Sequence, residues 1–192
     1  MKTFKEFMLT ETPQHYSGEV AYQKDTKFRD ISISNIKSMN IFDFDDEFYY
    51  VIDQAQLYGF VFDKMEFSSG KREIKPVLTV TLRDSVLGFK QAHRLRIRKD
   101  YARKNLTKRW YMLYIKEFGG IVSDHEHLEG GKLLWRSFVD MASQRSDVSV
   151  ALYDADAQEF IMKNISAETP DETIWSRDHT KKNLVMVMTY NG

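Results

Sequence analysis

The sequence predicts a mixed α/β domain, with a largely antiparallel sheet, helices on both faces and one parallel strand–helix–strand unit. Three observations lead to this prediction. Short β-branched or alternating runs recur along most of the chain. Two longer segments have the apolar spacing of amphipathic helices. One short buried run lies between those two helices, and a strand–helix–strand connection of this kind makes its two strands parallel.

The bulk composition describes an ordinary globular chain. It has 192 residues, 28 basic and 28 acidic side chains, and no cysteine. Cysteine chemistry of every kind is therefore excluded, including disulfides, cysteine-ligated zinc and a thiol nucleophile. The balanced charge argues against nucleic acid as a general partner, and no apolar run is long enough to span a bilayer. We expect one domain over residues 14–192, preceded by a separate peptide over residues 1–13.

The first thirteen residues carry an amphipathic pattern of their own. Phe4, Phe7 and Met8 recur at helical spacing, and Thr12 before Pro13 favours a helix end there. One interpretation is a terminal helix that packs on the domain. The other is an addressing peptide, since the MKT-aromatic start resembles the capsid-targeting peptides of tailed-phage internal head proteins, which are cut after a glutamate.

The expected elements follow from periodicity and turn residues. Each strand is a β-branched or alternating run, and each helix has an apolar stripe that ends near glycine or a polar turn. The expected strands lie within Gly18–Ile36, Leu57–Phe67, Val77–Leu82, His93–Arg98, Ile121–Asp124, Val148–Tyr153 and Leu184–Thr189, and the expected helices are Leu106–Phe118 and Lys132–Ala142.

The segment Asn40–Gln56 is both acidic and aromatic. Its carboxylates include Asp43, Asp45, Asp46 and Glu47. A carboxylate cluster can bind a hard metal through its oxygens. The same acids would also suit the solvated start of a helix, where negative charge is favourable. We favour the helix start and expect no metal here.

The stretch from His93 to Asp124 resembles the core of the GNAT N-acetyltransferase family. In that family a strand leads into a loop of the form basic-x-x-Gly-x-Gly/Ala, whose backbone N–H groups at a helix start bind the pyrophosphate of coenzyme A. Residues 101–107 correspond to that loop, with Asn105 at the first glycine and Thr107 at the second small position. The run Gly130–Trp135 matches a Gly-Gly-x-x-x-Trp signature of phage-encoded members.

This resemblance implies acetyl-CoA as cofactor and an amine as acceptor. Unpaired N–H groups at a helix start attract anions, and glycine lets the backbone approach a phosphate closely. Asparagine departs from the family pattern but tolerates a left-handed backbone better than most residues do. The implied phosphate-binding residues are Arg98, Arg103 and Lys104 through their charge, and Asn105, Leu106 and Thr107 through their backbone.

Catalytic residues are less well marked. Glu66, which we place at the end of a central strand, is a candidate base, and Tyr153 is a candidate acid for the leaving thiolate. The expected helix Lys132–Ala142 holds no tyrosine. Its Trp135 has an indole N–H that only donates, so it cannot serve as the acid. A surface carboxylate and a packed tyrosine are the structural alternatives for the two candidates.

Two further clusters have competing interpretations. Gln91–Arg109 holds eight basic residues and one acid, Asp100, so it could neutralise coenzyme phosphates, contact a nucleic-acid backbone or form a solvated face. The run Asp124-His125-Glu126-His127 resembles a metal cluster, but a third organised ligand such as His179 would have to come from far along the chain. We expect no metal and favour a pocket-lining role for this run.

The sequence thus supports two functional hypotheses. The first is an acyl-CoA-dependent N-acyltransferase in the cytoplasm of a host cell. The second is a non-catalytic phage protein that uses a GNAT scaffold as a virion component or to bind a host or defence factor. The altered loop and the missing tyrosine favour the second hypothesis, and the N-terminal peptide would favour packaging in the virion.

Overall fold

The computed structural model describes residues 29–192, except for residues 44, 103, 125–128 and 176–182. The described part is built on one nine-stranded sheet with the order β10-β9-β11-β8-β7-β6-β4-β3-β2. Every neighbouring pair in this sheet is antiparallel except β7 and β8. The predicted sheet class is therefore confirmed. The nine strands are β2 (Asn40–Asp43), β3 (Phe48–Ile52), β4 (Tyr58–Asp63), β6 (Leu78–Asp84), β7 (Lys90–Ile97), β8 (Gly120–Val122), β9 (Val148–Asp154), β10 (Glu159–Met162) and β11 (Leu184–Tyr190).

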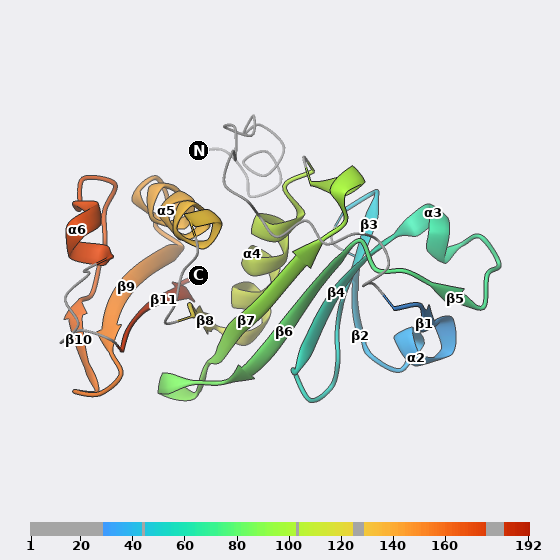
Figure 1. Ribbon diagram of the computed structural model, residues 1–192, viewed down its shortest axis with the longest axis horizontal. Helices are drawn as coiled ribbons and strands as arrows, with labels where there is room; N and C mark the ends of the chain where they lie inside the picture. The colour runs from blue at the N-terminus through green and yellow to red at the C-terminus, as the bar shows by residue number, and fades with distance from the viewer. Residues whose placement is uncertain (1–28, 44, 103, 125–128, 176–182) are drawn as a thin grey trace.

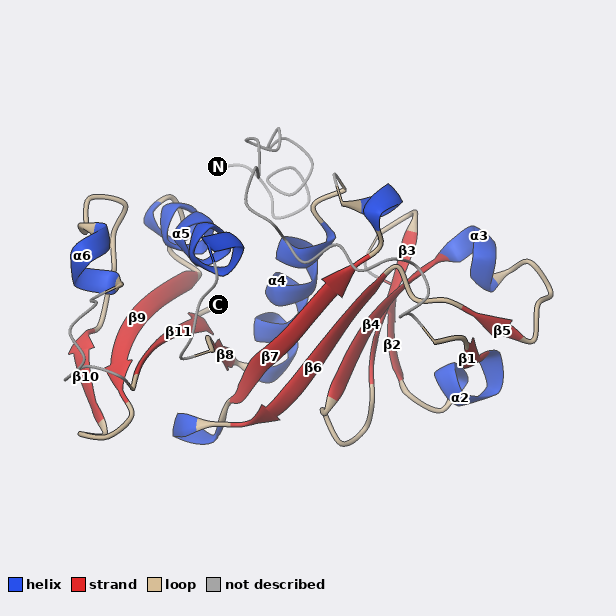
Figure 2. Ribbon diagram, in the orientation of Figure 1, coloured by secondary structure: helices blue, strands red, loops and turns tan. Residues whose placement is uncertain are grey.

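Two long helices cover one face of the sheet. They are α4 (Leu106–Phe118) and α5 (Glu129–Ser143), and both contribute to the largest buried cluster. The two helices also contact each other, because the Tyr111 ring lies 6.0 Å from Trp135 and 5.0 Å from Phe138. Helix α4 connects β7 to β8, which form the predicted parallel pair, and Figures 1 and 2 show this unit in the middle of the sheet.

The opposite face of the sheet is covered at its β3 side by a smaller layer. This layer holds helix α2 (Ile33–Lys37) and a two-stranded sheet of β1 (Ile31–Ser32) and β5 (Glu73–Ile74). The alternation along β3 explains both layers: Phe48, Tyr50 and Ile52 face the large cluster, whereas Val51 packs with Ile36 in the small one. Helices therefore lie on both faces, as predicted.

Two expected strands turn out to end in helices. The run to Ile36 forms α2 at its end, because the Ser32 hydroxyl accepts a hydrogen bond from the Asn35 N–H and starts the helix. The run to Phe67 ends as a strand at Asp63, whose carboxylate caps α3 (Lys64–Phe67). The prediction of a strand through these residues was wrong because capping side chains override the alternation locally.

The acidic segment at residues 40–56 is another correction. It forms the antiparallel hairpin of β2 and β3 and not a helix start. Within it, Asp45 Oδ1 accepts hydrogen bonds from the N–H groups of Glu47 (2.9 Å) and Phe48 (2.7 Å), so this acid organises a turn. The sequence patterns also missed β10, which is only four residues long, and the short helix α6 (Asp171–Ile174), which lies within a polar stretch.

One glycine fixes how α4 lies on the sheet. A Cβ atom added to Gly59 in β4 would lie 2.3 Å from the Trp110 indole of α4. Trp110 is fully buried, so the bulky ring occupies the space that glycine leaves. No helix in the described part of the chain is long and apolar enough to cross a membrane.

Candidate functional site

The start of α4 is the first of two places where unusual backbone and polar groups gather. After β7, a 3-10 helix at Lys99–Tyr101 leads to Asn105, the residue before the first turn of α4. Asn105 has a left-handed backbone, with φ of 56° and ψ of 23°. This is the conformation that a glycine would adopt at no steric cost, and asparagine tolerates it. Asn105 therefore holds the turn before α4 in a conformation that glycine would also adopt.

The first amides of α4 have no hydrogen-bond acceptor among the described residues. The Arg109 N–H makes the first backbone hydrogen bond of the helix, to the Asn105 carbonyl at 3.2 Å. The Asn105 side chain makes no capping hydrogen bond. No described residue accepts a hydrogen bond from the N–H of Leu106 or Thr107. Leu106 is fully buried, so its N–H does not face solvent, whereas Thr107 is half-buried and offers one donor to an anion at the positive end of this 13-residue helix.

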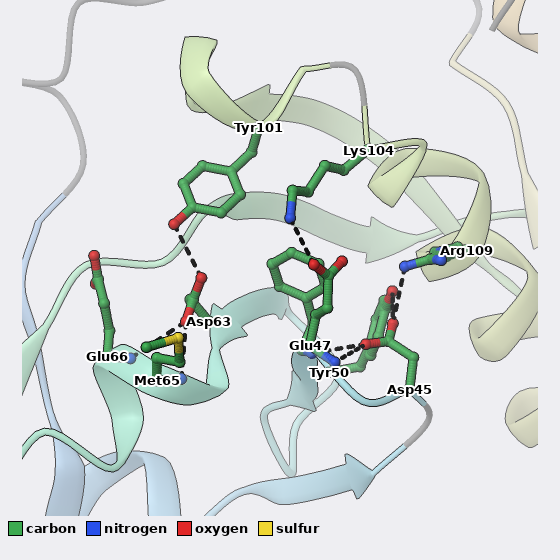
Figure 3. A network of polar contacts seen from close by, with 10 residues as sticks. Asp45, Glu47, Tyr50, Asp63, Met65, Glu66, Tyr101, Lys104 and Arg109 are labelled. Atoms are coloured by element: carbon green, nitrogen blue, oxygen red, sulfur yellow. Dashed lines mark hydrogen bonds and ion pairs between the residues drawn. The ribbon is translucent and has the colours of Figure 1, made fainter. Parts of the chain in front are cut away.

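The basic side chains predicted around these donors already have acidic partners. Lys104 Nζ lies 2.8 Å from Glu47 Oε1. Arg98 lies 2.9 Å from Asp100 and 3.5 Å from Glu66. Figure 3 shows Lys104 pointing toward Glu47 above the start of α4. Arg103, the third predicted cation, lies outside the described residues.

A more buried ion pair anchors the first turns of α4 to the hairpin. Arg109 Nη1 lies 3.1 Å from Asp45 Oδ2, and both side chains are largely buried. The same carboxylate oxygen accepts a hydrogen bond from the Tyr50 hydroxyl at 2.8 Å (Figure 3). Burial and the neighbouring Asp45 charge raise the pKa of Tyr50 far above its ordinary value. The network is therefore a fixed structural contact that places α4 against β3.

Tyr101 makes a similar contact with the next element. Its hydroxyl donates to Asp63 Oδ2 at 3.1 Å, while Asp63 Oδ1 accepts from the Met65 N–H (Figure 3). The ring also lies under the Arg98 guanidinium, 4.9 Å from its carbon. Burial, followed by the hydrogen bond to Asp63, raises the pKa of Tyr101 to about 12. The loop before α4 is therefore held by the same acids that shape α3 and the hairpin.

The structure does not bring the two predicted catalytic residues together. Glu66 lies in α3, not at the end of a strand, and pairs with Arg98. Tyr153 lies in β9 and is 5% exposed, with its ring 5.1 Å from Phe160. Helix α3 and strand β9 lie at opposite ends of the sheet in Figure 1. Tyr153 occupies a packed position, which was the structural alternative.

The second notable place is where β7 and β8 separate. Their parallel pairing covers only Lys90 with Ile121 and Gln91 with Val122. Beyond it, the Ser123 N–H donates to the Met186 carbonyl of β11 at 2.8 Å, so the chain follows β11 and leaves β7. The buried Gln91 side chain donates to the Ser123 carbonyl at 2.5 Å and closes the end of the ladder. The rest of β7, from His93 onward, has no pairing with β8.

A polar cluster sits at this separation. Asp124 Oδ1 accepts a hydrogen bond from Arg83 Nη2 at 3.1 Å, and its Oδ2 lies 3.3 Å from His93 Nδ1. His93 is the extra residue of a β-bulge, because the β6 pairing shifts between Thr81 and Leu82 at this point. We call Arg83, Gln91, His93, Ser123 and Asp124 the strand-split cluster.

The strand-split cluster has the parts of an acid–base site. A carboxylate at Nδ1 orients the imidazole and leaves Nε2 to exchange a proton with a bound group. The His93 side chain is 37% exposed, so a ligand can reach it. Sequence patterns missed this pairing, since His93 and Asp124 lie 31 positions apart. The available signal was that each residue belongs to one of two strands predicted to be parallel neighbours.

A metal at the Asp124–His127 run finds no further support. His125, Glu126, His127 and His179 lie outside the described residues. Within the described residues no group of three or more potential metal ligands occurs.

Comparison of the chain with protein-family models, with curated proteins and with solved structures matched none of them.

Proposed function

We propose that this chain is a GNAT-type, acyl-CoA-dependent N-acyltransferase. One observation carries the proposal: β7 and β8 stay paired for two residues and then separate, and the first turn of the helix between them holds an N–H, that of Thr107, with no acceptor among the described residues. The sheet class adds support, since the sheet is largely antiparallel and its one parallel pair is joined by a helix. This is the kind of sheet that the resemblance to the family implies.

The proposal assigns the coenzyme to β7 and the start of α4. The N–H of Thr107 would contact the pyrophosphate, with Lys104 and Arg98 nearby as cations, whereas the buried Leu106 is left out of this contact. From Ile97 back to His93 the strand covers about 13 Å, at about 3.3 Å per residue. An extended pantetheine arm along this unpaired strand edge would bring the thioester close to the strand-split cluster.

The chemistry would then use His93 as the base. An acceptor amine loses a proton to His93 Nε2, and its nitrogen attacks the thioester carbonyl carbon. The C–S bond breaks, the new C–N bond remains, and the thiolate takes the extra proton that the attacking nitrogen carries and leaves as coenzyme A thiol. Asp124 stabilises the protonated imidazole. Glu66 lies against Arg98 and has no role in this step, and no leaving-group acid is assigned.

The carboxylate partners of the loop cations are compatible with this role. Lys104 and Glu47 are 41% and 59% exposed, and ion pairs this exposed contribute only about 0–1 kcal/mol. A diphosphate carries more charge and more acceptor atoms than one carboxylate, so it can displace Glu47 from Lys104. Arg98 is more buried and keeps its acidic partners.

Acetyl-CoA binding is best tested by thermal shift. At a hundredfold excess over the dissociation constant, the ligand should stabilise the native protein by about 2.7 kcal/mol. Thr107→Pro removes one donor at a first-turn position that proline tolerates, so it should fold and lose most of the shift. Thr107→Ala keeps the donor and serves as the matched control. A native protein that shows no shift would refute coenzyme binding.

Catalysis needs a separate test with the same ligand. His93→Gln should keep the thermal shift but lower acyl transfer to a panel of amines by about 10²- to 10⁴-fold, the usual contribution of a general base. Asp124→Asn should lower transfer less, because it keeps the hydrogen bond but loses the charge. A His93→Gln variant with unchanged transfer would remove His93 from the mechanism.

A second candidate function rests on a different observation. Both described loop cations are bound to carboxylates, and α5 contains no tyrosine to protonate a leaving thiolate. These features suit a GNAT scaffold that no longer catalyses and that serves as a virion component or binds a host or defence factor. Absence of any coenzyme shift, together with detection of the chain in purified phage particles by mass spectrometry, would favour this function.

A further inference from the structure

The face of β4, β6 and β7 that points away from α4 carries an unusual set of side chains. Cross-strand pairing aligns them in two rows: Tyr58, Thr81 and Arg94 form one, and Phe60, Thr79 and Arg96 form the next. Alternation puts these six on one face, since Leu95 and Ile97 of β7 face the α4 cluster. We call these six residues the outer sheet face.

Two aromatic rings lie at one side of the outer sheet face. Tyr58 and Phe60 are stacked in parallel fashion, with centroids 6.2 Å apart and an interplanar angle of 17°. Tyr58 is 50% exposed, although large aromatic rings usually contribute to a core. Phe60 is half-buried against the small layer of α2 and is held in place by it. Phe60 also lies 6.0 Å from Phe62, so Tyr58 carries most of the ring surface that a ligand can reach.

Two arginines lie at the other side, across the threonines of β6. Arg94 is exposed and Arg96 is half-buried. Neither forms an ion pair with any residue that the structure describes, whereas Arg83 on the same face is bound to Asp124 and Arg98 to Asp100. Two residues of one strand, about 6.8 Å apart along its axis, therefore present guanidinium groups side by side that no carboxylate in the described part of the chain neutralises.

We propose that the outer sheet face binds single-stranded nucleic acid. Arg94 and Arg96 would contact successive phosphates, and the rings of Tyr58 and Phe60 would stack on exposed bases, with the threonine hydroxyls available to sugar or phosphate oxygens. A duplex hides its base faces in its own stack, so it would lose the aromatic contribution. The balanced charge of the whole chain does not oppose this, because the charge is local to one face.

The test is fluorescence anisotropy with a labelled oligothymidine of about 15 nucleotides and a duplex of equal length. The native protein should bind the single strand more tightly than the duplex. Arg94→Gln with Arg96→Gln should weaken binding and reduce the slope of log affinity against log salt by about 1.4, the value for two phosphate contacts to a single strand. Tyr58→Ala should weaken binding about fivefold or more, because a stacked base is lost.

A matched control separates these effects from a general loss of charge. Lys71→Gln with Lys163→Gln removes two exposed cations from other elements and should leave binding unchanged. Circular dichroism and melting curves should show that every variant folds, since four of the five target side chains are exposed and Arg96 is half-buried. An acidic peptide of equal charge serves as competitor and should displace the oligonucleotide poorly.

Three results would overturn the proposal. In the first, the native protein shows no anisotropy change at low salt. In the second, the lysine control variant loses as much affinity as the double arginine variant. In the third, the acidic peptide displaces the labelled oligonucleotide as well as unlabelled oligonucleotide does. The last result would identify a general anion surface or a protein-binding surface. Acetyl-CoA binding is measured separately at Thr107, so failure of one proposal leaves the other standing.

Discussion

The basic segment Gln91–Arg109 divides into two halves that the fold treats differently. In the strand half, Arg94 and Arg96 have no ionic partner among the described residues. In the loop and helix half, Arg98, Lys104 and Arg109 each lie against a carboxylate. The difference shows that a run of like charges in a sequence says little about which charges are available to a ligand. Two of the neutralising acids, Glu47 and Asp45, come from more than fifty positions away.

The largest expected effect lies in the buried pair of the helix half. Asp45→Ala should lower the free energy of unfolding by about 3 kcal/mol, because it leaves the Arg109 guanidinium and the Tyr50 hydroxyl without their shared acceptor. Urea denaturation followed by circular dichroism measures this change. Asp46→Ala, at an exposed neighbouring position, should stay within about 0.5 kcal/mol of the native protein. Equal effects of the two variants would contradict the assigned network.

A smaller loss is expected at the carboxylate that joins the loop to α3. Asp63→Ala removes the cap of α3 and the acceptor of the Tyr101 hydroxyl, so unfolding should become easier by about 1–2 kcal/mol. Asp63→Asn retains a side-chain oxygen for the cap and should recover much of the loss. Urea midpoints of the three proteins would decide this, and an Asn variant as unstable as the Ala variant would argue against capping.

Alkaline pH offers another test of the same contact. The pKa of Tyr101 is raised from 10.0 to about 12 in the folded chain, so the unfolded chain releases this proton first. The contribution of Tyr101 to the free energy of unfolding is therefore fully present below pH 10 and should be lost as the pH rises from 10 to 12. Tyr101→Phe should show a shallower fall than the native protein when urea midpoints are compared across that window. Identical slopes would show that this phenol does not contribute.

The smallest effects separate the exposed cations of the two halves. Lys104→Gln should cost less than about 1 kcal/mol, because its pair with Glu47 is exposed to solvent. Arg94→Gln should change the free energy of unfolding by less than about 0.5 kcal/mol, because Arg94 is exposed. Thermal melts at low and high salt check both, and only the Lys104 effect should shrink with salt. A large loss for Arg94→Gln would reveal a structural role and weaken its assignment as a ligand-binding cation.

Much of the fold was predictable because periodicity is strong where burial is strong. The helix expected at Leu106–Phe118 has these bounds in the structure, since its apolar stripe and the glycine after it agree. The parallel pair was predictable from the order of the elements along the chain, because a helix connects its two strands. Helices α2 and α3 were not predictable. Each begins because one capping side chain, a serine or an aspartate, accepts hydrogen bonds from the first turn, although the surrounding residues alternate as in a strand.

The sites were less predictable than the fold. The sequence indicated the loop before α4 and an asparagine in it that tolerates a left-handed backbone, and Asn105 has that backbone conformation in the structure. It could not show that Glu66 pairs with Arg98, or that His93 meets Asp124, because these contacts depend on register and on a bulge. The stacked rings of Tyr58 and Phe60 share their face with Arg94 only through pairing across β6.

The torsion angles of Asn105 have a consequence for the history of the loop. Exchange with glycine at this position would require no movement of the main chain, since the residue already occupies the region that glycine favours. A β-branched residue here would instead be strained. The step between this loop and a glycine-containing one is therefore a single side chain, reversible in either direction without refolding the turn around it.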